Sequence, residues 1–158
     1  KYHVAPAQIN LEITETAAAH SDMLENNIKI LHKQGIEFSL DDYGSGYSNT
    51  DYLFRFPFRI VKIDKTILWE AFKNEKAMIA LRNTIRMIKE LGLEIVVEGV
   101  ENQEYVDYLT EQHCDYLQGY FYSKPIPDRD FLELLRRENA QYYAERFSKN
   151  ELSDIITT

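Results

Sequence analysis

Short apolar runs with the two-residue period of β-strands alternate along the chain with longer runs that repeat at helical spacing. The first strand-like run shows the pattern clearly, because Ile9, Leu11 and Ile13 alternate with Asn10 and Glu12. This period places one side of the run in a core and the other side away from it. The runs that predict strands are residues 8–14, 36–42, 59–64, 93–100 and 115–126.

Between these runs, apolar residues recur every three or four positions, which predicts amphipathic helices. In the first of them, Leu24, Ile28 and Leu31 share one face, and in the clearest one Asn74 is the N-cap and Gly92 the stop. The runs that predict helices are residues 21–35, 47–58 (a short helix or turn), 74–92, 102–114 and 128–149. Such alternation of strands and helices is typical of a parallel sheet covered by helices.

Composition narrows the class of protein. The chain has 158 residues and a net charge of −8, which argues against a DNA- or RNA-binding protein because such a protein needs a basic face. Cys114 is the only cysteine, so a reducing, cytoplasmic setting is expected, and no apolar run is long enough for a membrane span. The chain starts at Lys1 without an initiator methionine and enters a strand pattern almost at once, so we expect a piece of a longer protein, whose membrane anchor, if it has one, lies outside this chain.

Polar residues recur where the predicted strands end. These residues are Glu12, Asp41, Asp42, Lys62, Asp64, Glu98 and Gln118. Taken singly, each has an ordinary structural explanation: a solvent-facing strand position, a turn or a helix cap. Together, at the carboxyl ends of parallel strands, they predict an active site, and the acidic members suit a hard cation such as Mg²⁺ or Mn²⁺. The four histidines share no spacing, and we interpret Trp69 as a packing residue.

Five segments that contain these residues resemble one family. They are "LEITE", "DDYGSGYSN", "KID", "VVEGVE" and "LQGYFYSKP", and they run in order from Leu11 to Pro125. On these motifs the chain resembles the EAL domains, bacterial phosphodiesterases that linearise cyclic di-GMP. The resemblance implies an α/β fold, a TIM-like (βα) barrel, of which this chain supplies about five of the eight strands. It also implies that residues 1–149 are the C-terminal part of a single EAL domain, with 150–158 as a frayed tail.

The resemblance implies a set of metal ligands. Glu12, Asp41, Asp42 and Glu98 match residues that hold two divalent cations, Mg²⁺ or Mn²⁺, with Asp41 shared between them. Two such cations close together bind the attacking water and neutralise charge on a phosphodiester.

It also implies roles for the remaining polar residues. Lys62, Glu101 and Gln118 match active-site residues, Lys62 the one that contacts the attacking water and Gln118 the one that helps to place water and phosphate. Glu15 matches the residue that steadies the glycine-containing loop after the paired aspartates. No residue is assigned to the binding of the rest of the substrate.

Two departures from the family pattern matter. The sequence contains no Glu-Ala-Leu motif, and the glutamate of that motif and a following asparagine, both metal ligands in the family, have no counterpart here. We therefore expect weak or no activity from the isolated chain. A part-barrel also exposes sheet edges, so we expect a homo-oligomer, including one formed by strand exchange. Milder changes are Tyr43, Ser45, Asn49 and Thr50 in the loop segment.

The function that these motifs imply is metal-dependent hydrolysis of cyclic di-GMP to linear pGpG in bacterial second-messenger signalling. An upstream sensor or a GGDEF-type domain is an expected companion in the parent protein. The alternative from another class is a non-catalytic cyclic di-GMP receptor or partner-binding domain that kept the fold. An unrelated barrel phosphoesterase is a third alternative.

Overall fold

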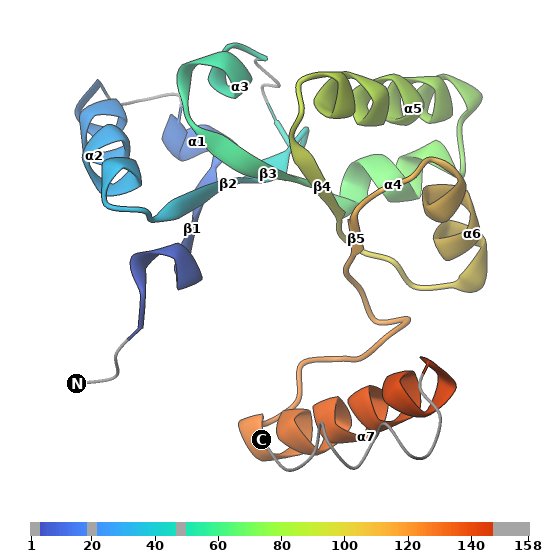
Figure 1. The fold of residues 1–158 in the computed structure, drawn as a ribbon. Coiled ribbons are helices and arrows are strands. Elements are labelled where there is room, and N and C mark those ends of the chain that lie inside the picture. The colour runs from blue at the N-terminus through green and yellow to red at the C-terminus, as the bar shows by residue number, and fades with distance from the viewer. Residues whose placement is uncertain (1–3, 19–21, 47–49, 147–158) are drawn as a thin grey trace. The chain divides into compact units, whose positions relative to one another are not determined.

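The structure is a computed structural model that describes residues 4–18, 22–46 and 50–146. The chain forms two compact units, Lys1–Tyr122 and Ser123–Thr158. Among these described residues, the first unit contains the five strands, and the second contains one long helix (Figure 1). The tail predicted at 150–158 lies outside the described residues.

The first unit is built on five parallel strands that pair in chain order, from β1 to β5. Parallel neighbours need a crossover, and a helical connection between successive strands supplies it each time. Within the described residues the sheet does not close, and the fold is that of an incomplete TIM-like barrel. The strands are β1 (Asn10–Thr14), β2 (Glu37–Tyr43), β3 (Phe58–Ile63), β4 (Glu94–Val97) and β5 (Tyr116–Leu117).

The helices follow the predicted pattern and add three short ones. The described helices of the first unit are η1 (Pro6–Gln8), α1 (Glu15–Ala18), α2 (Asp22–Lys33), α3 (Asp51–Arg55), α4 (Lys65–Ala71), α5 (Glu75–Glu90) and α6 (Gln103–Glu111). As predicted, the Asn74 side chain caps α5 by accepting from the Lys76 N–H, and Gly92 follows the helix with a φ of 75°. Every helix among the described residues is too short or too polar to cross a membrane.

The core lies on the side of the sheet that the helices cover. Leu40, Val61, Ile63, Ile95 and Val97 are fully buried, and they alternate along their strands with residues that face the other way. Helices contribute further apolar side chains to this core. These are chiefly Ile28, Leu68, Leu81, Ile85, Ile88 and Leu109.

The edges of the sheet differ from the sequence prediction. Strand β1 begins only at Asn10, so Ile9 of the predicted run precedes it and is exposed. Within β1, Ile13 is buried, whereas Leu11 is exposed, because β1 has one neighbouring strand among the described residues. Strand β5 has two residues in place of a predicted run of twelve, since the chain turns away after Leu117.

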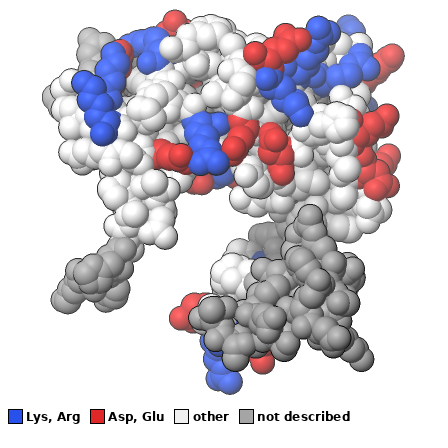
Figure 2. Space-filling view, in the orientation of Figure 1, with Lys and Arg blue, Asp and Glu red and all other residues white. Residues whose placement is uncertain are grey.

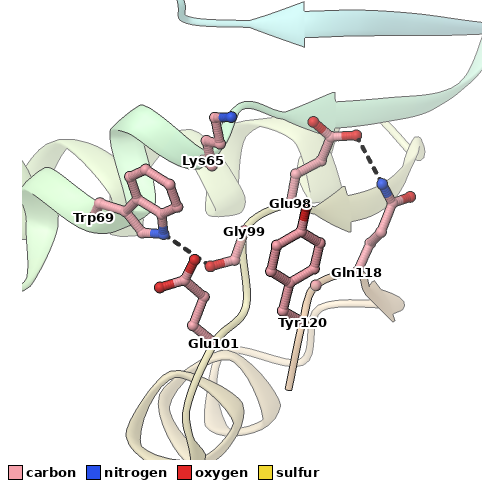
Figure 3. Close-up of a pocket in the computed structure, with 8 residues that line it drawn as sticks. Lys65, Trp69, Glu98, Gly99, Glu101, Gln118 and Tyr120 are labelled. Carbon is pink, nitrogen blue, oxygen red and sulfur yellow. Dashed lines mark hydrogen bonds between the residues drawn. The ribbon is translucent and has the colours of Figure 1, made fainter. Parts of the chain in front are cut away.

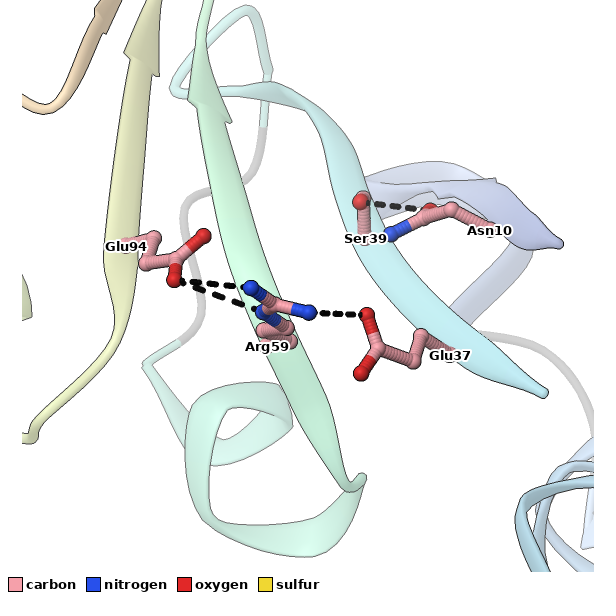
Figure 4. Close-up of polar contacts among 5 residues, drawn as sticks. All are labelled: Asn10, Glu37, Ser39, Arg59 and Glu94. Carbon is pink, nitrogen blue, oxygen red and sulfur yellow. Dashed lines mark hydrogen bonds and ion pairs between the residues drawn. The ribbon is translucent and has the colours of Figure 1, made fainter. Parts of the chain in front are cut away.

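Arg59 joins three strands at the end of the sheet where they begin. Its guanidinium lies 2.5 Å from the Glu37 carboxylate at the start of β2 and 3.1 Å from the Glu94 carboxylate at the start of β4 (Figure 4). Hydrogen bonds to these two carboxylates raise the pKa of Arg59. On β1 and β2, Asn10 accepts a hydrogen bond from Ser39 at 2.7 Å. These contacts fix the strands relative to one another at the amino end, opposite the end where the conspicuous polar residues lie.

The second unit is dominated by α7 (Asp128–Arg146), which agrees with the helix predicted to start at Asp128. Phe131 and Leu135 of this helix are exposed, whereas Leu134 is half-buried.

Candidate active site

Strand alternation and register place four of the predicted site residues on one face of the sheet. Glu12 on β1 pairs with Ser39, and Asp41 lies two positions beyond Ser39 on the same face of β2. Lys62 on β3 pairs with Val96, and Glu98 lies two positions beyond Val96. This face is opposite the one that packs on the helices, and the residues lie near the carboxyl ends of the strands.

Asp42 reaches the same site through an irregularity in β2. Between Leu40 and Tyr43 the register of β2 against β3 shifts, because three steps along β2 span two along β3. This is a β-bulge, and Asp42 takes up the extra residue with a φ of 57°. The left-handed backbone breaks the alternation that would send neighbouring carboxylates to opposite faces. The two aspartates therefore point to one site because β2 is bulged, and not because the strand has ended, since β2 continues to Tyr43.

Lys62 lies at the centre of the acidic group. Its ammonium is 2.8 Å from an Asp41 oxygen, 3.0 Å from a Glu98 oxygen and 3.1 Å from a Glu12 oxygen. Burial of the side chain by itself would lower the pKa of Lys62, but hydrogen bonds to the three carboxylates outweigh it and raise the pKa above its ordinary value. Lys62 is therefore a fixed positive charge at neutral pH.

Three carboxylates form a group that could hold a cation. One oxygen each of Asp41, Asp42 and Glu98 lies within 4.8 Å of the others, and all three side chains are half-buried. An all-oxygen donor set of this kind fits a hard divalent cation. Glu12 lies outside this group but forms an ion pair with Lys62, which also contacts Asp41 and Glu98.

A pocket of about 220 Å³ opens beside the carboxylates. The Gln118 amide donates a hydrogen bond of 3.3 Å to Glu98 on one side, and Tyr120 and Glu101 line other parts of the wall (Figure 3). The predicted residue Glu101 thus lies in the pocket beside Glu98 but outside the group of three carboxylates.

Glu15 lies next to the site and contacts the loop after the paired aspartates. Its side chain is 5% exposed, and Oε2 accepts a hydrogen bond of 3.1 Å from the Gly44 N–H. The buried carboxylate thereby fixes the backbone two residues after Asp42. Asn49, one of the residues that depart from the family pattern, lies outside the described residues.

Two residues have contacts near the site that the sequence did not predict. Trp69 packs against the hydrophobic core, as predicted, but it also lines the pocket and donates its indole N–H to the Gly99 carbonyl at 2.8 Å. A half-buried indole N–H needs a hydrogen-bond partner, and this need was the only sign of the contact in the sequence. Asp64, one of the polar residues at the strand ends, caps α4 by accepting from the Thr66 N–H at 2.9 Å, which is the ordinary structural explanation.

Basic and acidic side chains are mixed on one face of the molecule. Figure 2 shows Lys and Arg side chains beside Asp and Glu side chains over the face drawn. Opposite charges also meet at the site itself, where the Lys62 ammonium contacts three carboxylates.

Comparison with known proteins establishes the family. The family model described as "EAL domain" matches residues 1–125, which is most of the 158-residue chain. The chain belongs to the EAL domain family. It is 34% identical over 135 residues to the cyclic di-GMP phosphodiesterase RocR of Pseudomonas aeruginosa, an alignment that covers 84% of this chain and 34% of RocR. The chain spans about a third or less of the length of the first curated relatives that it matches.

Solved structures agree with the fold. The PaMucR phosphodiesterase in its c-di-GMP complex superposes with a TM-score of 0.76 at 31% identity, over 81% of this chain and 52% of that one. Klebsiella pneumoniae BlrP1 in a manganese and cyclic di-GMP complex gives a TM-score of 0.72 at 28% identity, over 77% of this chain and 31% of that one. The BlrP1 structure is thus a similar fold that holds manganese, and in this chain the group of three carboxylates has a donor set that suits such a cation.

Proposed function

We propose that this chain supplies part of the active site of a metal-dependent phosphodiesterase that hydrolyses cyclic di-GMP to linear pGpG. The observation that carries the proposal is the convergence of Asp41, Asp42 and Glu98 within 4.8 Å at the carboxyl ends of the strands, with Lys62 among the acidic groups. We infer the substrate from the names of the relatives, and the metal-dependent reaction from the oxygen ligands of the site.

Mg²⁺ or Mn²⁺ is the cation that this donor set fits. Asp41, Asp42 and Glu98 would hold it, with Glu12 as a further ligand. Bound divalent cations supply the neutralisation of phosphate charge and the activation of water that phosphodiester hydrolysis needs. The carboxylates contribute by holding this positive charge in a fixed place on a rigid sheet.

Lys62 contributes a permanent positive charge and hydrogen-bond donors. Hydrogen bonds to the three carboxylates raise its pKa, so the ammonium that makes these contacts is protonated at neutral pH. An ammonium in this position can donate to an attacking water or to a phosphoryl oxygen on which negative charge grows. Its three carboxylate contacts hold the side chain at that place before substrate binds.

The other predicted residues position this group. Gln118 donates to Glu98 and so orients that carboxylate, while its amide remains on the pocket wall where water and phosphate can reach it. Glu15 holds the backbone of the glycine-containing loop through Gly44. Glu101 lines the pocket and is available to a polar group of the substrate or its water.

For the 158 residues alone, we propose weak or no turnover. Two ligands that the family resemblance implies, the glutamate of the Glu-Ala-Leu motif and a following asparagine, have no counterpart in this sequence. The activity is therefore proposed for a protein that also supplies these two ligands, and this chain spans about a third or less of the length of its first curated relatives.

Chromatographic detection of pGpG tests the proposal. The full-length protein is incubated with cyclic di-GMP and Mg²⁺, with and without EDTA, beside an Asp41→Asn variant and an Arg86→Gln variant as a surface control. We expect turnover that EDTA abolishes, that Asp41→Asn lowers by about 100-fold or more, and that the control leaves unchanged. Nucleotide binding without turnover would favour the non-catalytic receptor instead.

A further inference from the structure

Trp69 connects the first two turns of α4 to the loop that carries Glu98. Its indole Nε1–H donates to the carbonyl oxygen of Gly99 at 2.8 Å, and Gly99 is bonded directly to Glu98. The Lys65 ammonium lies over the Trp69 ring, 5.5 Å from its centroid. The indole is therefore held by a charged neighbour on its own helix while its N–H holds the loop.

The backbone at Gly99 shows how closely α4 and this loop approach. Gly99 has a φ of 72°, and a Cβ there would lie 2.3 Å from Lys65 Cβ and 3.0 Å from Trp69 Nε1. Only a residue without a side chain fits between helix and loop. The hydrogen bond from Trp69 is thus made across a tight contact, where small displacements of the loop meet resistance.

These contacts close a ring that starts and ends at Lys62. Strand β3 carries Lys62 and leads through the Asp64 cap into α4. Helix α4 carries Trp69, which binds Gly99, and the adjacent Glu98 carboxylate lies 3.0 Å from the Lys62 ammonium. In such a ring, the position of Glu98 relative to Lys62 is fixed from two sides.

We propose that Trp69 is a positioning residue for the Glu98 carboxylate, and that its N–H bond to Gly99 raises the affinity of the site for a divalent cation. The inference rests on the proposed metal site and assigns a function to a residue outside the ligand set. Carboxylate position matters because a cation of fixed size needs its oxygen ligands at one distance. Loss of one net hydrogen bond is expected to weaken cation binding by about threefold to tenfold.

Mn²⁺ affinity measured by electron paramagnetic resonance tests this on the intact chain. Trp69→Phe removes the N–H, and benzothienylalanine at position 69 removes it while keeping the bicyclic ring. Phe72→Leu is the control, because Phe72 belongs to the same end of α4 but packs on Tyr105 and Tyr108. Both replacements of Trp69 should raise the Kd for Mn²⁺ by about threefold to tenfold, and Phe72→Leu should leave it unchanged.

A spectroscopic readout reports whether cation binding at Glu98 reaches the Trp69 indole. Trp69 is the only tryptophan, so a ¹H–¹⁵N spectrum holds one indole cross-peak. Mg²⁺ should shift that peak saturably in the wild-type chain and should require a higher concentration in Glu98→Gln.

An unchanged Kd in both Trp69 variants, or an equal loss of affinity in Phe72→Leu, would overturn the inference while the metal site stands. A wild-type chain that binds no Mn²⁺ would contradict the proposed metal site itself, and the inference with it.

Discussion

At the scale of single residues, the conformation of Asp42 decides what the site can be. A regular strand would carry Asp41 and Asp42 on opposite faces, and the bulge at a φ of 57° brings their carboxylates together. Two neighbouring carboxylates repel each other, and Lys62 offsets part of that repulsion through Asp41. A divalent cation would offset more of it.

Two substitutions at Asp42 distinguish the effect of its carboxylate on cation binding from the effect of its left-handed backbone on stability. Asp42→Asn keeps a residue that tolerates the left-handed region, so we expect little change in the midpoint of thermal unfolding but a Kd for Mn²⁺ at least about tenfold higher. Asp42→Ala adds backbone strain of about 1 kcal/mol or more and should unfold at a lower temperature. Equal thermal stability of the two variants would contradict the role given to the bulge.

Cys114 should be unreactive in the folded chain. Burial raises the pKa of its thiol from 9.0 to about 12, so at pH 8 the thiolate fraction is about a thousandfold lower than for an ordinary thiol. We expect slow alkylation by iodoacetamide that accelerates as pH rises and becomes fast in urea. Equal rates in native and urea-unfolded protein at pH 8 would show that burial does not protect the thiol.

The residues of the site could be predicted to the extent that the strand period reveals them. Polar residues interrupt the apolar pattern near the carboxyl ends of the predicted strands, and the structure places four of them on one face of the sheet. These are Glu12, Asp41, Lys62 and Glu98. The bulge could not be predicted, because two aspartates before a glycine are equally typical of a simple turn.

At the scale of elements, α4 is the part of the fold on which the site depends most. It starts at the Asp64 cap immediately after β3 and packs against the loop that follows β4. The sequence predicted the long helix α5 from its period and its caps, but α4 has seven residues, and a run of that length shows too few repeats to be recognised. The short β5 was overestimated because its aromatic residues resemble a strand whether or not they pair.

Two glycines allow a matched test of the contact between α4 and the loop. Gly92 and Gly99 have nearly equal φ angles of 75° and 72°, but a Cβ at Gly92 meets no atom within 4 Å. Gly92→Ala should therefore cost about 1–2 kcal/mol of unfolding free energy from strain alone. Gly99→Ala adds a steric clash and should cost about 3 kcal/mol or more. Urea unfolding measures both, and equal costs would contradict the close approach of α4.

At the scale of the whole molecule, the amino end of the sheet has a structural role and the carboxyl end has the proposed catalytic role. At the amino ends, Arg59 on β3 joins β2 and β4 through ion pairs that stabilise the sheet. At the carboxyl ends lie the carboxylates that we propose as metal ligands. Five parallel strands with helical crossovers could be predicted from alternation alone, since each crossover has a recognisable helical run or short helix.

The outer strand β1 should drive self-association of the 158-residue chain. Leu11 is 39% exposed on a strand that has one paired neighbour among the described residues. We expect light scattering at micromolar concentration to show oligomers, and Leu11→Lys to reduce them. Ile79→Lys, at an apolar residue of α5 that is 43% exposed, is the control and should have no effect. A monodisperse wild-type monomer would contradict the prediction.

We propose that the carboxylates of β2 and of the loop after β4 hold a divalent cation, and anomalous scattering from crystals of the protein grown with Mn²⁺ tests this proposal. We expect an anomalous peak about 2.1 Å from carboxylate oxygens of Asp41, Asp42 or Glu98. Well-ordered carboxylates without any such peak, with Lys62 still bound to Asp41 and Glu98, would contradict it.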